Sequence, residues 1–308
     1  MKCYKSDIPW CDYGSSPVTG CYHPCRRQFC YAAAIVKRWH GPGGDGIDPP
    51  AWDGLHVLDE PFRYQHERDA DGHPSADPYP FGFHPTFHRY RIDVPAPRKP
   101  GRVFVVPMGD LWGEWVPLTW QDEVLAACSR DKRHDYLFCT KNPQAYRGID
   151  WSDKPWAWLG ATATGVAGAG GFHGAAAHLA VLRGKPTTFI SMEPWMGGDD
   201  GLDAIGAVVG SCSLAWLIIG PLTGTKARTA PPVSRDAVLQ LRDACQRAGV
   251  ALFVKPSATS WGLTPDEIAT MQAFPRPHPN VATYRDADAF QALPFESAVP
   301  ERGQASLL

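Results

Sequence analysis

The chain has 308 residues, 44% of them hydrophobic, and a formal net charge of −2. This length suffices for one large core or two modest ones. Without a basic excess, a nucleic-acid ligand would need a local basic patch. No apolar run approaches the ~20 residues of a membrane span, and the first residues are too polar for a secretion signal. We therefore expect a cytoplasmic protein whose nine cysteines are reduced thiols.

Three cysteines, Cys21, Cys25 and Cys30, form a C-x3-C-x4-C pattern on one short segment. Three thiolates can hold three irons of a [4Fe-4S] cube, whereas four cysteines would saturate it. The fourth iron then stays open for a ligand that is not protein. An open iron is what S-adenosylmethionine requires to chelate such a cluster. The pattern therefore predicts an iron–sulfur site of this kind.

Other interpretations of the cysteines remain open. A structural zinc site would need a fourth ligand, which His23 could provide, but no second close pair of cysteines follows. Cys3 and Cys11 lie near enough in sequence for a disulfide framework. The four remaining cysteines lie within apolar segments and are expected to be buried, inert thiols: Cys128, Cys139, Cys212 and Cys245.

The cysteine pattern is preceded by a predicted short strand, residues 17–19, and followed by a predicted helix, residues 31–39. Residues 40–91 are rich in Gly, Pro, Asp and His and have no sustained period. So long an irregular stretch is uncommon in a compact domain and is often functional. We expect this insert to build no core of its own and to cover the catalytic edge as a lid. Its irregularly spaced histidines favour solvated loop residues over a second metal site.

From residue 102 onward, short apolar runs alternate with helical patterns. Apolar runs of this kind are typical of strands buried on both faces. The predicted strands are 103–107, 136–140, 157–162, 187–191, 215–220 and 251–254, and the predicted helices are 120–129, 174–182 and 234–248. For the last helix, Ser234 is the expected N-cap and Gly249 the expected stop.

Repeated βα units predict an α/β fold with a parallel sheet that closes into a full or partial barrel. An open, doubly wound sheet is the alternative. We expect residues 1–256 to form the barrel domain, with the insert at about 40–91. Residues 257–308 would form a Pro-rich extension that caps the barrel or is partly disordered.

Polar residues end or follow several predicted strands. They are Asp110, Lys141, Thr162, Glu193 and Lys255. In a βα barrel, functional residues collect where strands end and the following loops begin. Acidic and basic groups on one edge predict a convergent polar site. The two lysines favour a substrate that is anionic or bears a carbonyl group.

Several segments together resemble one family. These are Pro17-Val18-Thr19-Gly20-Cys21 with Cys25 and Cys30-Tyr31-Ala32, and residues 106–112, 140–143, 158–160, 190–194, 216–220 and 253–255. They resemble the radical-SAM-like proteins of unknown function found in phages, bacteria and archaea. The likeness spans most of the chain except the insert and the tail. It implies a radical-SAM-type barrel.

The resemblance also implies roles for individual residues. Cys21, Cys25 and Cys30 would ligate the [4Fe-4S] cluster, and Phe29 would lie near the adenine of S-adenosylmethionine. Gly109 and Asp110 resemble the Gly-Gly-Glu element that holds the methionine amino group, and Thr162 and Glu193 would lie near the ribose or carboxylate. Two features depart from the family. The loop has two more residues before its last cysteine than the usual C-x3-C-x2-C pattern, and residues 220–224 lack the expected Glu-Ser.

The function expected first is that of a radical-SAM enzyme. A reduced cluster would split S-adenosylmethionine, and the resulting radical would abstract hydrogen from an unidentified substrate. Lys141, Glu193 and Lys255 are the expected catalytic residues. An electron donor of the flavodoxin or ferredoxin type is expected. The occurrence of the family in phages suggests a nucleotide or nucleic-acid substrate, by analogy.

The alternative is a non-catalytic protein that binds nucleic acid and is stabilised by zinc or an iron–sulfur cluster. Four basic residues beside the cysteines could contact phosphate: Arg26, Arg27, Lys37 and Arg38. This alternative requires a closed metal site and a salt-dependent affinity, whereas the enzyme requires an open iron.

Overall fold

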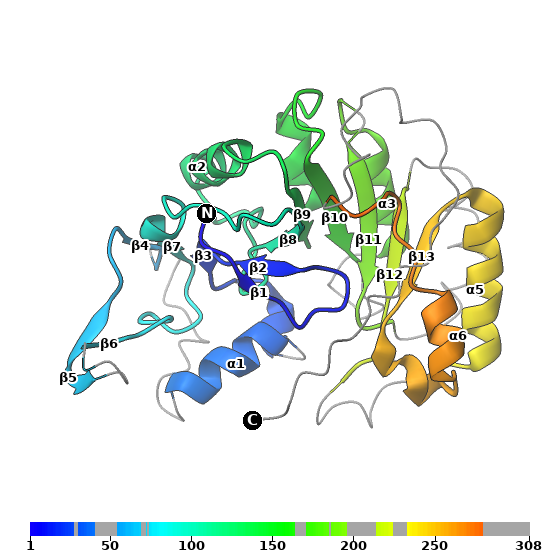
Figure 1. The fold of residues 1–308 in the computed structure, drawn as a ribbon, viewed down its shortest axis with the longest axis horizontal. Coiled ribbons are helices and arrows are strands. Elements are labelled where there is room, and N and C mark those ends of the chain that lie inside the picture. Colours follow the sequence, from blue (N-terminus) through cyan, green and yellow to red (C-terminus); the bar gives the residue numbers. More distant parts are fainter. Residues whose placement is uncertain are drawn as a thin grey trace.

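The computed structural model describes residues 1–27, 30–40, 54–68, 72, 74–163, 171–184, 186–195, 214–223 and 233–279. Within these ranges, the largest sheet has eight strands in the order β1-β2-β8-β9-β10-β11-β12-β13 (Figure 1). Its strands are β1 (Tyr4–Lys5), β2 (Tyr13–Ser15), β8 (Arg102–Val105), β9 (Asp135–Thr140), β10 (Ala157–Thr162), β11 (Thr187–Met192), β12 (Trp216–Ile219) and β13 (Ala251–Val254). Only the pairing of β1 with β2 is antiparallel.

The parallel strands follow one another in chain order, as the alternation of strands and helices predicts. Since the order has no reversal, the sheet is not doubly wound. The described strands show no pairing that closes a barrel. The free side of β13 instead bonds to the chain beyond it, where Phe253 bridges Gln272 in antiparallel fashion. The fold is therefore a mixed α/β fold with a mostly parallel central sheet.

The strand that begins the parallel series is β2, so the prediction that residues 17–19 begin it is wrong. Those residues form β3 (Val18–Thr19), which pairs with β7 (Thr86–His88) in a separate three-stranded sheet. Strand β2 could not be predicted from the sequence because the strand has only three residues and contains Gly14. That glycine has a packing reason, since a Cβ there would lie 2.5 Å from the ring of Tyr4.

The described part of the insert is ordered and contributes to the core, contrary to the expectation of an irregular loop. It contains β4 (His56–Leu58), β5 (Arg63–Arg68), β6 (Pro74–Ala76), β7 and the 3₁₀ turn η2 (Arg89–Arg91). Phe83 and Phe87 are buried in the main core. Strands β4 and β7 have three residues each and pair with segments that are distant in the sequence, so no local period predicts them. The hairpin of β5 and β6 extends away from the central sheet (Figure 1).

Arginines at the end of the insert attach it to the body of the protein. Arg89 forms ion pairs with Glu123, at 2.9 Å, and with Asp59, at 2.6 Å. Arg91 donates a hydrogen bond to the Ser16 carbonyl at 2.7 Å. The contacts with Glu123 and Ser16 attach the end of the insert to residues outside it, whereas the ion pair with Asp59 lies within the insert.

Residues of the strands alternate between two buried clusters. Leu159 and Leu217 belong to the large cluster that includes the helices, whereas Trp158 and Trp216 belong to an aromatic cluster on the opposite face. This alternation reflects the two-residue period of a strand. A parallel sheet that is apolar on both faces must be covered on both, which explains the continuous apolar runs in the sequence.

Helices connect the strands and cover the larger cluster. They are α1 (Tyr31–His40), α2 (Leu118–Ser129), α3 (Phe172–Ala180), α5 (Arg235–Ala248) and α6 (Pro265–Thr270), with 3₁₀ turns η1 (Pro24–Arg27), η3 (Pro143–Gly148) and η5 (Pro256–Trp261). Ser234 caps α5 by accepting a hydrogen bond from Ala237 N, and Gly249 ends it in the left-handed region. Both predictions for this helix are confirmed. None of the described helices is long and apolar enough to cross a membrane.

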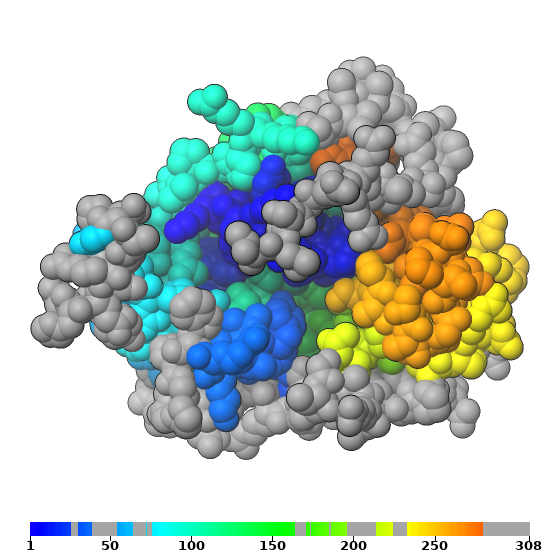
Figure 2. All heavy atoms as spheres, turned by 60° about the horizontal axis from the view of Figure 1, so that its bottom comes forward, coloured from blue at the N-terminus to red at the C-terminus, as the bar shows by residue number. Residues whose placement is uncertain are grey.

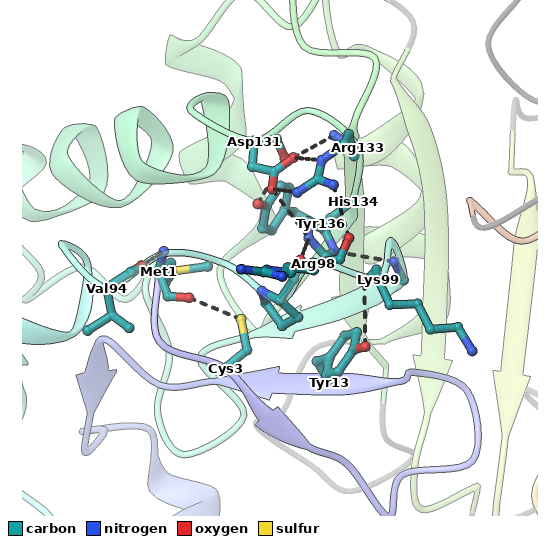
Figure 3. Close-up of polar contacts among 12 residues, drawn as sticks. Met1, Cys3, Tyr13, Val94, Arg98, Lys99, Asp131, Arg133, His134 and Tyr136 are labelled. Carbon is teal, nitrogen blue, oxygen red and sulfur yellow. Dashed lines mark hydrogen bonds and ion pairs between the residues drawn. The ribbon is translucent and has the colours of Figure 1, made fainter.

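The amino-terminal edge of the sheet is closed by polar contacts between loops. His134 donates to the Pro97 carbonyl at 3.1 Å and accepts from Gly101 N at 3.2 Å, and Tyr136 donates to the Asp131 carbonyl at 3.0 Å (Figure 3). These contacts hold the loop before β8 against the loop before β9. They leave the opposite, carboxyl-terminal edge as the place for function.

The chain after α6 closes the same amino-terminal edge. Arg276 forms an ion pair with Asp135 at 2.6 Å, and His278 contacts Asp12 at 2.8 Å. Arg102 stacks on Phe274, with its guanidinium carbon 3.7 Å from the ring centre. In the space-filling view, the N-terminal segment lies between the insert and the region of α5 and α6 (Figure 2).

His88 is a buried histidine whose neutral form the fold requires. Its Nε2 lies 2.9 Å from the Thr19 hydroxyl, and burial, with the nearby Arg91, lowers the pKa of His88 to about 2. In the unfolded chain the imidazole binds a proton below pH 6.5, whereas in the folded protein it stays neutral at that pH. The free energy of unfolding should therefore fall by up to ~1.4 kcal/mol per pH unit below 6.5 because of this group.

Replacing His88→Gln should remove that component. Denaturant unfolding at pH 7.5, 6.5, 5.5 and 4.5 should give a flatter dependence for the variant than for the wild type. Parallel curves for the two proteins would contradict the prediction.

Candidate functional site

The predicted polar residues gather at the carboxyl-terminal edge of the parallel sheet. Lys141 follows β9, Thr162 ends β10, Glu193 follows β11 and Lys255 follows β13. Neighbouring strands are in register there, with Thr162 beside Ser191. Because parallel strands end at the same edge, side chains from distant parts of the sequence meet in one place.

The cysteine loop lies against the same edge. Cys21 and Cys25 are buried, Cys25 lies within η1, and Cys30 directly precedes α1. The amide of Cys21 donates to the Phe83 carbonyl of the insert at 3.2 Å. Phe29, expected near the adenine, lies outside the described residues. The loop is thus held from the insert side by a backbone hydrogen bond.

Two glycines bring the cysteine loop close to the end of β8. Gly20 and Gly109 form a parallel bridge, and the amide of Gly20 donates to the Met108 carbonyl at 2.9 Å. A Cβ on Gly109 would lie 2.7 Å from the Gly20 carbonyl oxygen, and Gly20 itself has a φ of +81°. Gly109, predicted to bind cofactor, therefore has a structural role in this close approach.

Backbone strain occurs at the same turn. Val106, a β-branched residue, has a φ of 62° at the end of β8. Such a conformation costs on the order of 1–3 kcal/mol and persists only where its surroundings impose it. Here its amide donates to the Ser15 carbonyl at 2.6 Å. The strain lies immediately before the segment that carries Asp110.

Asp110 connects the cysteine loop to two strand ends. Its Oδ2 lies 2.8 Å from Nε2 of His23 and accepts hydrogen bonds from the Thr140 hydroxyl at 2.9 Å and the Lys141 amide at 3.1 Å. Its Oδ1 accepts from the Trp112 amide at 2.9 Å. Burial raises the pKa of Asp110, but His23 and the hydrogen bonds from Lys141 and Thr140 lower it by more. The net shift of this pKa is therefore downward.

Both carboxylate oxygens of Asp110 already accept hydrogen bonds, four in all. The first role of Asp110 is therefore to hold the cysteine loop in place. His23, considered in the sequence as a zinc ligand, is instead paired with this carboxylate. The spacing gives no sign of the pair, since 87 positions separate the two residues.

The three thiols of the loop influence one another's pKa values electrostatically. Burial raises the pKa of Cys21 well above its ordinary value, and Asp110, Cys25 and Cys30 add to the increase. Burial also raises the pKa of Cys25, which Lys141 opposes. The amide of His23 points at the Cys21 sulfur, 3.4 Å away.

A single-ion site is not preformed. In the part of the chain that the structure describes, no three Cys, His, Asp or Glu side chains are grouped so that they could hold one metal ion. A [4Fe-4S] cube distributes its thiolates over separate irons, so its ligands need not converge on one point.

The two remaining acidic and basic residues of the edge pair with each other. The Lys255 ammonium lies 3.2 Å from the Glu193 carboxylate, and both side chains are largely buried. Gly220 makes room for this lysine, since a Cβ there would lie 2.6 Å from the Lys255 Cδ atom. Two of the three predicted catalytic residues are thus brought together.

Two residues of this edge were given no role in the site by the sequence, and one of them, Cys139, was expected to be a buried, inert thiol. The half-buried Cys139 lies 3.4 Å from the Thr162 hydroxyl, and burial raises its pKa to about 12. Tyr31 donates its hydroxyl hydrogen bond to the Pro107 carbonyl. The position of Cys139, two residues before Lys141 on the same strand face, was the available signal. Cys128 and Cys245 are buried elsewhere, as expected, and Cys212 lies outside the described residues.

Aromatic rings join the insert to the cysteine loop. The Tyr22 hydroxyl donates to the Gly54 carbonyl at 3.2 Å and lies 3.1 Å from Nδ1 of His84. Trp115 packs against both Tyr22 and His23, with ring centres 5.5 and 4.8 Å apart. The described part of the insert therefore lies beside the cysteine loop.

A family model described as "Protein of unknown function (DUF5131)" matches residues 5–274. The chain belongs to this family. No curated protein matches the chain.

Solved structures of spore photoproduct lyase are similar to the chain at low identity. One, complexed with dinucleoside spore photoproduct, is 11% identical, with a TM-score of 0.42. Another, a mutant with bound AdoMet and dinucleoside spore photoproduct, is 10% identical, with a TM-score of 0.44. In both cases the match covers 80% of this chain and 64% of the other, so the chain spans less than two thirds of their length.

The close approach of Gly20 and Gly109 gives a stability prediction. Gly109→Ala should lower the free energy of unfolding by roughly 1–3 kcal/mol, because its methyl group would press on the Gly20 carbonyl. Gly148→Ala is the matched control, since a Cβ there meets nothing within 4 Å. Denaturant unfolding of the three proteins measures the effect. Equal stability of Gly109→Ala and the wild type would contradict it.

Proposed function

We propose that this protein is a radical-SAM-type enzyme. It would use a [4Fe-4S] cluster to cleave S-adenosylmethionine and abstract hydrogen from a substrate. The observation that carries this proposal is the position of three neighbouring thiols on one loop, held against the carboxyl-terminal edge of a parallel sheet. Acidic, basic and hydroxyl side chains of the strand ends line the same edge, as a polar cofactor and substrate would require.

The residues present fit a thiolate-bound cluster. Thiolates are the protein ligands of such clusters, and the loop offers Cys21, Cys25 and Cys30. The backbone amide directed at the Cys21 sulfur suits an anionic sulfur better than a neutral thiol. Lys141 supplies positive charge beside the loop. When bound, the cluster would supply one-electron chemistry.

The chain's own residues would do the positioning. Asp110 and His23 hold the loop to the ends of β8 and β9. For S-adenosylmethionine, Thr162 and Glu193 are proposed contacts, since they end neighbouring strands on the edge. Phe29, Gly109 and Asp110 remain proposed neighbours of the same ligand on the strength of the family pattern.

The substrate is proposed to be a nucleotide or nucleic acid. An electron donor of the flavodoxin or ferredoxin type would reduce the cluster. Lys141, Glu193 and Lys255 are the proposed catalytic residues, with Lys255 already paired to Glu193 in the structure. That pairing lowers the net charge that Lys255 offers to an anionic substrate, which leaves Lys141 as the stronger anion-attracting group.

Cluster assembly tests the proposal directly. Anaerobic reconstitution should load about four iron and four sulfide per chain, the composition of the cube. Replacing each of Cys21, Cys25 and Cys30 by Ala should abolish loading. Cys245→Ala, in a buried helix position away from the loop, should load normally. Incubation of the loaded, reduced protein with S-adenosylmethionine should then release 5′-deoxyadenosine.

Stoichiometric zinc that survives reconstitution would refute the proposal. Together with a salt-dependent affinity for nucleic acid, it would establish the metal-stabilised binding protein instead.

The contacts to S-adenosylmethionine need variants other than Asp110→Ala, which would also release His23 and the loop. Thr162→Val and Glu193→Gln should each weaken binding by roughly fivefold to tenfold, the effect of losing a neutral or charged hydrogen bond. Iron content should not change. Thr270→Val, at the end of α6, is the control. Calorimetry on the reconstituted proteins measures the affinities, and unchanged values for both variants would rule these contacts out.

A further inference from the structure

Lys141 differs from the other lysine of the edge. Lys255 is paired with Glu193 at 3.2 Å. The ammonium of Lys141, although half-buried, makes no hydrogen bond or ion pair with any residue that the structure describes. An unpaired buried charge costs free energy, so its retention points to a negative group that joins it in the functional protein.

The position of Lys141 is fixed by the segment around it. Its amide donates to Asp110 at 3.1 Å, and the preceding Thr140 donates to the same carboxylate. The following Asn142 donates its side-chain amide to the Trp112 carbonyl at 2.8 Å. Three successive residues are therefore bound to the turn after β8, and the backbone of the lysine is held in place.

The segment that carries Lys141 is bound to the cysteine loop through Asp110, whose Oδ2 accepts from the Lys141 amide and lies 2.8 Å from Nε2 of His23, which stands between Cys21 and Cys25 in the sequence. Burial lowers the pKa of Lys141, but Cys25, Cys139, Cys21 and Asp110 raise it, and the net shift is upward. Of these groups, Asp110 has its oxygens occupied by other donors. Two of the thiols, Cys21 and Cys25, belong to the loop proposed to bind the cluster.

We propose that Lys141 compensates the negative charge of the cysteine loop and raises the reduction potential of the cluster bound there. The inference rests on the proposed function. A one-electron reduction by an external reductant adds negative charge to the cluster without taking up a proton. A fixed cation nearby stabilises the reduced form more than the oxidised one, and low solvent exposure strengthens this effect.

Redox titration of the reconstituted protein with dithionite, followed by absorption and electron paramagnetic resonance, tests the proposal. The midpoint potential should become more negative in Lys141→Met, which keeps the length of the side chain but not its charge. Lys141→Arg should stay near the wild type. Lys99→Met, an exposed lysine at the opposite edge of the sheet, should match the wild type.

The outcomes separate the inference from the proposed function. A wild type that assembles no cluster refutes both, whereas a loaded Lys141→Met protein with an unshifted potential refutes the inference alone. If that potential is unshifted and calorimetry shows weaker binding of S-adenosylmethionine, Lys141 is a ligand-binding residue instead.

If Lys141→Met takes up no iron, its midpoint potential cannot be measured, and the iron content of two further variants tests the inference instead. Loading of Lys141→Arg but not of Lys141→Gln, with all variants folded by thermal unfolding, shows that the positive charge is required. Failure of folded Lys141→Arg as well shows that shape rather than charge matters, and overturns the inference.

Discussion

The site depends on one buried carboxylate. Asp110 accepts hydrogen bonds from the turn that carries it, from the end of β9 and from the cysteine loop through His23. A buried charge is stable only when such donors surround it, so each partner is constrained to keep its place. The carboxylate thereby fixes the relative positions of the cysteine loop and Lys141. The two glycines at 20 and 109 permit the same arrangement by letting the backbones meet.

The two edges of the sheet serve different purposes. At the amino-terminal edge, charges are paired and stacked, as with Arg276 on Asp135 and Arg102 on Phe274. At the carboxyl-terminal edge, the structure holds a strained Val106, a lysine without a partner among the described residues, and buried thiols. Strain and uncompensated charge cost stability, and they concentrate at functional sites.

The regular half of the fold could be predicted because its signals are local. Strands β10 and β13 have the predicted bounds, and the cap and stop of α5 are where Ser234 and Gly249 indicate. The first strand and the insert could not be predicted in the same way. Strand β2 has three residues, and strands β4 and β7 of the insert are formed by pairing with segments distant in the sequence. Their stability comes from contacts such as those of Phe87 in the main core, which no local period records.

The candidate site shows the same division between local and distant information. Position after an apolar strand is a local signal, and it correctly brought Lys141, Thr162, Glu193 and Lys255 to one edge. The partner of a charged side chain is not a local signal. Lys255 is paired with Glu193, which follows another strand, and the sequence around a lysine does not show whether such a partner exists. The sequence treated both lysines alike. The structure distinguishes them by their partners, and that difference is the basis of the role proposed for Lys141.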